Sequence, residues 1–259
     1  MGSEKDEYSP TRADICAVAL AECFRGDGEI VANPIGVLPM VGGRLARASF
    51  EHDLLMTDGE AFLIANDEAF TWPAGKVVEA YNPYRWMFDV CFSGRRHVIM
   101  GASQIDRYGN QNFAAIGSDF SKPKAQLIGF RGAPGNVINH VTSYWIPNHS
   151  SRVFVDRVAF VTGPGWDSVR AAGPAAVEFF ELRRVVTNLC VLDWMTSDKS
   201  MRLQSVHPGV SVDEVVAATG FPLEIPSEVP ESRSPTQAEV RLLREVIDVD
   251  GLREKEVPS

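Results

Sequence analysis

The residues best suited to chemistry lie in three short segments, residues 58–60, 101–104 and 132–139. The first carries two carboxylates, Asp58 and Glu60, which could serve as a general base or as a nucleophile. The other two combine glycines with amide side chains. Each segment follows an apolar run, and if these runs are parallel strands, the segments lie beyond their carboxyl ends. Open parallel sheets bind their ligands there, so we expect the site at that edge.

Motifs of several other catalytic classes are missing from the sequence. It contains no GxxxxGK[ST] phosphate loop, no HExxH zinc motif, no GxSxG nucleophile turn and no GxGxxG after a strand. The five histidines are scattered and the four cysteines form no CxxC pair, so we expect no metal site. The glycine-rich residues 129–135 are either a phosphate cradle or a backbone that needs tight turns.

Helix signals and apolar runs alternate along the chain and predict the elements that position these segments. Ser9 and Pro10 predict the start of a helix that ends near residue 24. Further helices are expected at residues 37–48 and at 236–247, where a Thr-Gln-Ala-Glu capping box stands. Residues 66–85 are expected to form a long loop. Strands are expected at residues 29–32, 54–57, 97–101, 125–130, 152–161 and 183–191.

Short strands that alternate with helices predict an α/β protein with an open, mainly parallel sheet flanked by helices. With 259 residues, the chain can bury a full core without disulfides. We expect a mobile lead over residues 1–10 and one main domain over residues 11–225. A linker and helix over residues 226–259 should pack on the same domain.

The charge balance excludes several kinds of partner. Lys and Arg number 25 against 34 Asp and Glu, a net charge of −9, whereas nucleic acids and anionic membranes attract basic surfaces. No apolar run reaches the roughly 18 residues that a membrane span needs, and the N-terminus lacks the pattern of a secretory signal. We therefore expect a cytoplasmic protein with buried free thiols.

Three segments are more specific when taken together. They read GASQIDRYGNQN at residues 101–112, RGAPGN at 131–136, and HPGVSVDEV at 207–215, which ATGF follows at 218–221. Their order resembles that of the beta subunit of the class I coenzyme A (CoA) transferase family over roughly residues 10–225. The resemblance implies a CoA-transferase-like fold and a CoA thioester as substrate, with no separate cofactor.

Residue by residue, the same segments also have structural interpretations. Gly101, Gly109 and Gly135 would permit turns that a side chain blocks. Polar side chains of the first segment could instead hydrogen-bond nearby backbone and hold the loops in place. These side chains are Gln104, Asp106, Asn110 and Asn112.

The family's chemistry depends on one glutamate of the beta subunit, in an S-E-N-G turn after a strand. Here the turn reads Thr57-Asp58-Gly59-Glu60, so Asp58 is one methylene shorter than the glutamate and Glu60 stands two positions further on. Because a displacement of about 1 Å can cost on the order of a hundredfold in rate, the change argues against a covalent glutamyl intermediate. A plain turn at Asp58-Gly59 is the alternative.

The stretches LLMTDGEA, RRHVIMGASQIDRYGNQN and RGAPGNVINHVTSYW also resemble the beta subunits of the actinobacterial cholesterol ring-cleaving hydrolases. These belong to the same superfamily but lack the glutamate. The resemblance implies a retro-Claisen reaction, in which water opens the last steroid ring, carried as a CoA thioester. It also implies an alpha subunit as partner in an alpha2-beta2 heterotetramer. That partner would supply the main acid/base glutamate.

On this resemblance, Asp58 and Glu60 are the catalytic candidates of the chain. The candidates for substrate binding are Gly101, Gln104, Gly135, Asn136, Asn139, His140 and Tyr144. A group of aromatic residues could wall a steroid pocket, or pack in the core or at a subunit interface. This group comprises Trp72, Tyr81, Tyr84, Trp86 and Phe88.

Two other functions stay open. The chain could be the beta subunit of a true CoA transferase for a 3-oxo acid, with Asp58 or Glu60 as nucleophile. It could also be a supporting subunit without catalytic groups that only completes the pocket of the alpha chain.

Overall fold

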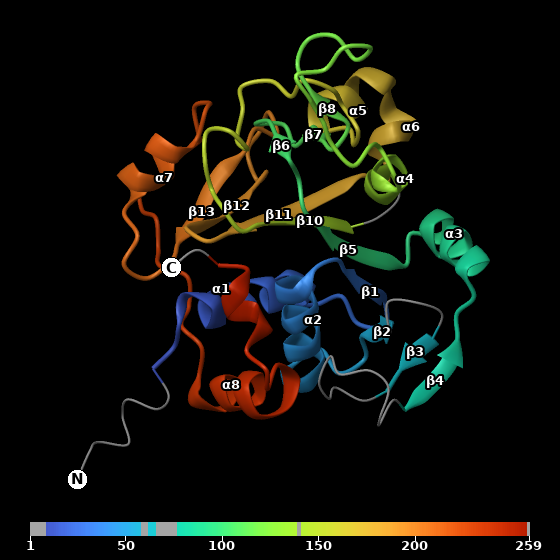
Figure 1. Cartoon of the computed structure of the whole chain (residues 1–259), viewed down its shortest axis with the longest axis vertical. Helices are drawn as coiled ribbons and strands as arrows, with labels where there is room; N and C mark the ends of the chain where they lie inside the picture. The colour runs from blue at the N-terminus through green and yellow to red at the C-terminus, as the bar shows by residue number, and fades with distance from the viewer. Residues whose placement is uncertain (1–8, 58–61, 66–76, 139–140, 258–259) are drawn as a thin grey trace.

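A nine-stranded sheet forms the centre of the part of the chain that the structure, a computed structural model, describes (residues 9–57, 62–65, 77–138 and 141–257; Figure 1). The strand order is β13-β12-β11-β10-β5-β1-β2-β3-β4. The middle of the sheet is parallel, as expected. Its strands are β1 (Val31–Pro34), β2 (Leu55–Thr57), β5 (Arg96–Met100), β10 (Val141–Ile146) and β11 (Glu181–Thr187).

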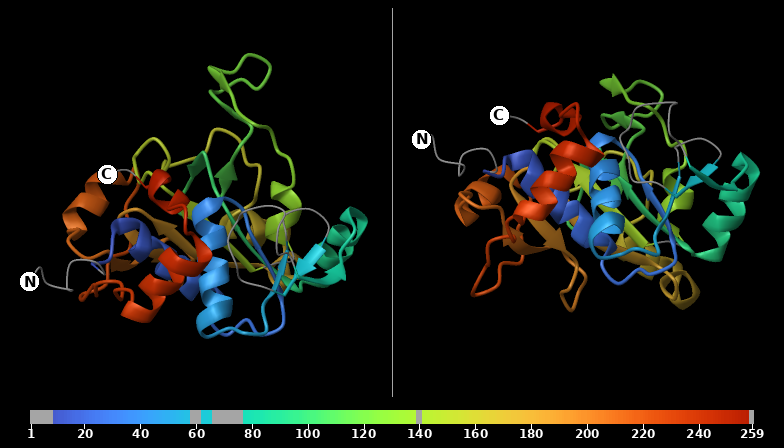
Figure 2. Two further views of the ribbon diagram at one scale, coloured as in Figure 1. Left: turned by 60° about the horizontal axis from the view of Figure 1, so that its bottom comes forward. Right: turned by 90° about the horizontal axis from the view of Figure 1, so that it is seen from below.

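Antiparallel strands complete the sheet at both edges. They are β3 (Phe62–Ile64), β4 (Val78–Tyr81), β12 (Cys190–Asp193) and β13 (Arg202–Val206). Two short ribbons lie outside the sheet, and the β8–β9 ribbon projects from the body (Figure 2). The ribbons pair β6 (Gln104–Ile105) with β7 (Gln111–Asn112), and β8 (Ala115–Ile116) with β9 (Ala125–Gln126).

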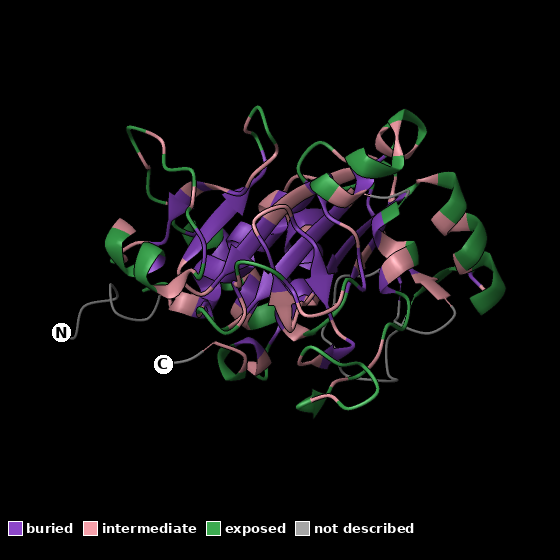
Figure 3. Ribbon diagram, turned by 90° about the horizontal axis from the view of Figure 1, so that it is seen from above, coloured by how far each residue is buried: buried purple, intermediate pink, exposed green. Residues whose placement is uncertain are grey.

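Helices cover both faces of the sheet, and the buried residues gather between the layers (Figures 1 and 3). On one face lie α1 (Arg12–Ala21) and α2 (Val37–Ser49), with α8 (Gln237–Arg241) and the π-helical turn Leu242–Ile247 beside them. The predicted α/β class is therefore confirmed. The remaining helices are α3 (Tyr84–Ser93), α4 (Ala133–Ile138), α5 (Trp166–Ala172), α6 (Pro174–Val177) and α7 (Val212–Ala218). No described helix is long and apolar enough to cross a membrane.

Capping boxes fix where several helices begin. The predicted box before the C-terminal helix is confirmed, because Thr236 and Glu239 cap each other's backbone. The predicted helix start at Ser9 and Pro10 is wrong. The first helix begins at Arg12, since the Thr11 hydroxyl accepts from the Asp14 backbone N–H at 3.2 Å and the Asp14 carboxylate accepts from the Thr11 N–H at 3.0 Å.

Three predicted strands differ in the structure. Residues 183–191 include parts of two antiparallel strands, β11 and β12, rather than one strand. Of residues 125–130, only Ala125–Gln126 is a strand, and it lies outside the main sheet. Residues 152–161 form turns with an isolated bridge at Phe154. Phe154 and Val158 are buried nonetheless, so the apolar pattern there indicates burial of a loop and not a strand.

The strand β10 and the helix α3 have no counterpart among the predicted elements. Residues 66–76 of the predicted loop lie outside the described residues, but residues 78–81 form β4 and α3 begins at Tyr84. No residue of α3 is buried, and its large apolar side chains are mostly exposed. Tyr84, Met87, Phe88 and Cys91 follow one another at i, i+3, i+4 and i+7, so the helical spacing of apolar residues was present in the sequence and was overlooked.

A buried ion-pair cluster fastens the C-terminal segment to α1. The Asp14 carboxylate is fully buried and accepts from Arg253 Nε at 2.8 Å and from Arg244 Nη2 at 2.7 Å. Arg253 also pairs with Asp248 at 2.9 Å. Burial alone would raise the pKa of Asp14, but hydrogen bonds from Thr11 and the two arginines outweigh it and lower the pKa.

Asp14→Asn should therefore lower the free energy of unfolding by about 3–5 kcal/mol, because it breaks a buried ion-pair network by removing the carboxylate that Arg244 and Arg253 both contact. Urea denaturation followed by circular dichroism measures the loss. The matched control is Asp119→Asn, which removes an exposed carboxylate from the β8–β9 hairpin and should change nothing measurable. Equal, small effects of both substitutions would show that the cluster does not stabilise the fold.

Candidate functional site

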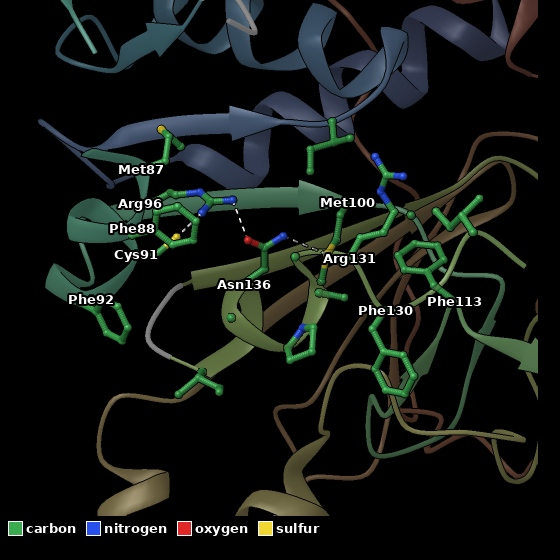
Figure 4. A pocket seen from close by; sticks show the side chains of 18 of the residues that line it. Met87, Phe88, Cys91, Phe92, Arg96, Met100, Phe113, Phe130, Arg131 and Asn136 are labelled. Carbon is green, nitrogen blue, oxygen red and sulfur yellow. Dashed lines mark hydrogen bonds between the residues drawn. The ribbon is translucent and has the colours of Figure 1, made fainter. Parts of the chain in front are cut away.

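A pocket of about 660 Å³ lies over the face of β5, between α3 and α4 (Figure 4). A volume of this size suits a small-molecule ligand. Apolar side chains dominate its walls, among them Met87, Phe88, Met100, Phe113, Ile128 and Phe130.

One end of the pocket lies where we expected the site. Ile35 directly follows β1 and Gly101 directly follows β5, so this end lies beyond the carboxyl ends of two neighbouring parallel strands. The pocket then extends back along β5 as far as Arg96, the first residue of that strand. It therefore occupies the face of a strand as well as the edge of the sheet.

Three of the predicted binding residues line this pocket, namely Gly101, Gly135 and Asn136. The structural interpretation of the two glycines is wrong, because neither has a positive φ and a Cβ on either would meet no atom closer than 3.8 Å. Gly109 does need to be glycine: its φ is +86° and a Cβ would collide with Leu182. The absence of a side chain at the first two positions leaves space in the pocket instead.

Only part of the predicted aromatic group lines the pocket. Tyr84 and Phe88 contribute to the wall from α3. Tyr81 and Trp86 are 58% and 52% exposed and lie outside it. Several predicted residues lie outside the described residues, namely Asp58, Glu60, Trp72, Asn139 and His140.

The other two predicted binding residues, Gln104 and Tyr144, do not line the pocket. The Gln104 amide oxygen accepts from Asn112 Nδ2 at 2.8 Å and from the Ala159 backbone N–H at 3.1 Å, so it holds two loops together. Tyr144 is fully buried and packs edge-on against Trp194, with ring centroids 6.4 Å apart. Burial raises the pKa of Tyr144, and its hydroxyl has no hydrogen-bond partner among the described residues.

The polar side chains of the segment 101–112 hydrogen-bond one another and neighbouring loops, and we call this network the bracket. Asn110 Nδ2 donates to Asp106 at 3.0 Å and to Asp167 at 2.8 Å, and Asn110 Oδ1 accepts from the Gly165 N–H at 2.7 Å. Burial raises the pKa of Asp106 to about 6. Apart from Gly101, which lines the pocket, the most specific sequence motif therefore holds the loops of one sheet face in place.

Arg96 is a pocket residue that the sequence analysis did not single out. It is 4% exposed, and its guanidinium donates to Cys91 Sγ at 2.7 Å and to Asn136 Oδ1 at 2.8 Å (Figure 4). Its Nε has no partner in the described part of the chain, and burial lowers the pKa of the guanidinium. The available signal was the alternation along residues 96–100, which places Arg96 on the same face as Met100.

The described lining of the pocket has no obvious general base. None of the described residues that line it is Asp, Glu or His. The described part of the pocket can therefore bind an apolar ligand with an anionic group, but a base must come from elsewhere.

A second group of residues has the connectivity of a Ser-His-Asp triad. His97 Nδ1 lies 2.7 Å from Asp27 Oδ2, and His97 Nε2 lies 2.9 Å from Ser143 Oγ. His97 and Ser143 are both 0% exposed, so no substrate can contact the hydroxyl. Burial lowers the pKa of His97, although Asp27 opposes this. The group is a buried hydrogen-bond network between the sheet and the end of α1.

A family model with the description "Coenzyme A transferase" matches residues 85–218, more than half of the chain. These residues contain most of the pocket lining and the whole bracket. The chain belongs to the coenzyme A transferase family.

Curated relatives within the coenzyme A transferase family extend over nearly the whole chain. The "Cholesterol ring-cleaving hydrolase IpdB subunit" of Rhodococcus jostii RHA1 is 49% identical over 95% of this chain and 96% of the relative. One subunit of the 3-oxoadipate CoA-transferase of Pseudomonas knackmussii is 34% identical over 86% of this chain and 85% of the relative. The crystal structure of Rhodococcus jostii RHA1 IpdAB matches with a TM-score of 0.91 and 48% identity, covering 97% of this chain and 100% of that one.

The buried triad-like group should not react as a nucleophile. Treatment of the folded chain with a fluorophosphonate should leave Ser143 unlabelled, because the reagent cannot contact a fully buried hydroxyl. Mass spectrometry of tryptic peptides measures the labelling, with Ser143→Ala as the matched blank. A stoichiometric phosphonyl adduct on Ser143 would overturn the structural assignment.

Two other histidines are also buried in hydrogen-bond networks. His149 lies 3.1 Å from the Thr187 hydroxyl and 3.0 Å from that of Thr219, and it stacks on Phe154. His207 Nε2 lies 2.9 Å from the Thr187 carbonyl oxygen. Burial lowers the pKa of each to about 4. Among the described residues, no three His, Cys, Asp or Glu side chains are grouped so that they could hold a metal ion.

These two histidines should make stability fall in mild acid. Their folded pKa values of about 4 lie below the ordinary 6.5, so their contribution is complete above pH 6.5 and is lost as the pH falls toward 4. Between pH 7 and pH 5, each histidine should lower the free energy of unfolding by about 2 kcal/mol. The raised pKa of Asp106 should offset about 1 kcal/mol of this loss. Urea unfolding of His207→Asn should show a shallower pH dependence than that of wild type. Identical slopes in the two proteins would contradict this account.

Proposed function

We propose that this chain is the beta subunit of a heteromeric hydrolase that opens a ring of a steroid-derived CoA thioester in the breakdown of cholesterol or related steroids. The observation that carries the proposal is the similarity to the IpdB subunit of Rhodococcus jostii over nearly the whole of both chains. The matching IpdAB structure supports the same assignment, since the fold agrees over the same length.

The proposed reaction is the hydrolysis of a carbon–carbon bond next to a ring ketone. Water adds to the ketone carbon, and the bond to the neighbouring carbon of the thioester breaks. The electron pair of that bond leaves as the enolate of the thioester, which then takes up a proton. The former ketone becomes a carboxylate, so the product has gained one water. This sequence needs a base for the water and donors for the developing negative charge.

The chain would supply the apolar wall of the pocket and a buried guanidinium, Arg96. Since no described lining residue is a carboxylate or an imidazole, the main acid/base group comes from the partner chain in this proposal. Asp58 and Glu60 remain candidates for a contribution from this chain, with Asn139 and His140 as candidate binding residues.

An alpha subunit is the proposed partner, in an alpha2-beta2 heterotetramer. The surface of α3 supports the need for a partner, because large apolar side chains are exposed there. Tyr84 and Phe92 are 76% and 78% exposed, and Trp86 and Phe88 are 52% and 54% exposed. Exposed apolar clusters of this kind mark surfaces that another molecule covers.

CoA enters the proposal as part of the substrate, with no separate cofactor. The cytoplasm is the proposed compartment. The cysteines support it, because all four are free and three of them are buried.

The second candidate is a true CoA transferase in which Asp58 or Glu60 is the nucleophile. The 34% identity to one subunit of a 3-oxoadipate CoA-transferase favours it over unrelated reactions. The shortened carboxylate at the turn 57–60 argues against it. A supporting subunit without any catalytic group is the third candidate.

The experiment reconstitutes the chain with its alpha subunit and supplies 2-oxocyclohexanecarboxyl-CoA, a cyclic 3-oxoacyl thioester. We expect the pair to add one water and form the open-chain dicarboxylic monothioester, and each chain alone to be inactive. Mass spectrometry of the product detects the addition of water. Mass spectrometry of the protein, quenched with borohydride, detects any covalent adduct. A stoichiometric acyl or CoA adduct on Asp58 or Glu60 would replace the hydrolase with the transferase, and turnover by the chain alone would refute the shared site.

A further inference from the structure

We propose that the guanidinium of Arg96 binds a carboxylate of the ligand in the pocket between α3 and α4. The inference rests on the proposed function for the identity of the ligand. It rests on the geometry of the pocket for the carboxylate.

The first observation is a buried cation that has no counter-ion among the described residues. Arg96 is 4% exposed and forms no ion pair with a described carboxylate. A guanidinium has five N–H donors. Among the described residues, those of Arg96 have two partners, Cys91 Sγ and the Asn136 amide oxygen, and Nε is buried without a partner. Burying a charge is costly unless an opposite charge compensates it, and no carboxylate of the described residues compensates this one.

The second observation is that this cation lines the pocket. Arg96, Asn136 and Cys91 belong to the same wall, and Figure 4 shows the Asn136 amide between Arg96 and Met100. Asn136 Oδ1 accepts from Arg96 and its Nδ2 lies 3.7 Å from Met100 Sδ, so Asn136 fixes the orientation of the guanidinium. A guanidinium held in one plane is suited to a planar carboxylate, which it can bind through two parallel hydrogen bonds.

The rest of the wall argues for one small anionic group on an apolar ligand. Met87, Phe88 and Met100 surround this region with apolar surface, and no second cation accompanies Arg96 there among the described lining residues. The other described guanidinium of the lining, Arg131, is exposed and lies at the opposite side in Figure 4. A phosphate carries more charge than one buried arginine neutralises, so a carboxylate is the better match.

The carboxylate has two sources in the proposed reaction. The ligand can carry it before ring opening, or ring opening can create it from the ketone. In the first case Arg96 acts in substrate binding. In the second case Arg96 binds a group that becomes anionic during the reaction. It then raises the rate of ring opening and the affinity for the product.

The test uses the reconstituted complex and two uncleavable probes, cyclohexanepropionate and its amide. Titration calorimetry should show that the carboxylate binds wild type at least about tenfold more tightly than the amide, which is the size of a charge-assisted hydrogen bond. Arg96→Met should abolish this preference. Arg131→Met removes the exposed guanidinium of the same pocket and should keep the preference.

A stability readout separates binding from a structural role. The carboxylate probe should raise the melting temperature of wild type and of Arg131→Met, and not that of Arg96→Met. Arg96→Lys keeps the charge but loses the two-pronged geometry, so it should retain only part of the preference. If Arg96→Met does not fold, Arg96→Lys decides the question. Equal affinity of both probes for wild type, or a preference that survives either Arg96 substitution undiminished, would overturn the proposal.

Turnover of 2-oxocyclohexanecarboxyl-CoA distinguishes the two sources, because this substrate has no carboxylate until its ring opens. A lowered kcat and weaker product inhibition in Arg96→Met would identify the carboxylate that ring opening forms. Unchanged turnover with a lost probe preference would identify one that the ligand brings. If wild type shows the probe preference but never opens the ring, the proposed function fails and the carboxylate site stands.

Discussion

The alternation of side chains along β5 is the constraint on which the site depends. β5 lies between β1 and β10 and is buried on both faces, so each of its side chains must suit one of two different environments. His97 and Ile99 face α1 and α2, where His97 joins Asp27 and Ser143. Arg96 and Met100 face the pocket. A shift of register by one residue would move the cation into the apolar core and the pocket would lose it.

The residues that stabilise the fold differ from the residues that line the pocket. Gln104, Asn110 and Asn112 use their amides inside the protein, where they hold the loops 101–112 and 159–165 against the sheet. The pocket is lined instead by side chains of α3 and by the glycine-rich turn before α4. This separation explains how one framework can support different reactions, since the pocket residues can change while the bracket stays the same.

The sequence predicted the framework well wherever local signals agree with burial. The helix expected at residues 37–48 is α2, and the strand expected at 97–101 is β5 within one residue. Prediction failed for α3, whose apolar residues are exposed within this chain, and for residues 152–161, whose apolar residues pack as a loop. It also missed Arg96, because an arginine next to a strand is ordinarily a surface residue and only the fold shows that this one is buried.

The distribution of charge in the pocket has a consequence for the proposed enzyme. The described lining holds cationic groups and no carboxylate, although the chain as a whole has a net charge of −9. A site that hydrolyses a ring bond needs both a cation for the developing anion and a base for the water. In the proposed enzyme the cation belongs to this chain and the base to its partner, so that water would be activated only where the two subunits meet. We then expect the free beta subunit to bind a CoA thioester without hydrolysing it, because the proposed activating group is absent until assembly.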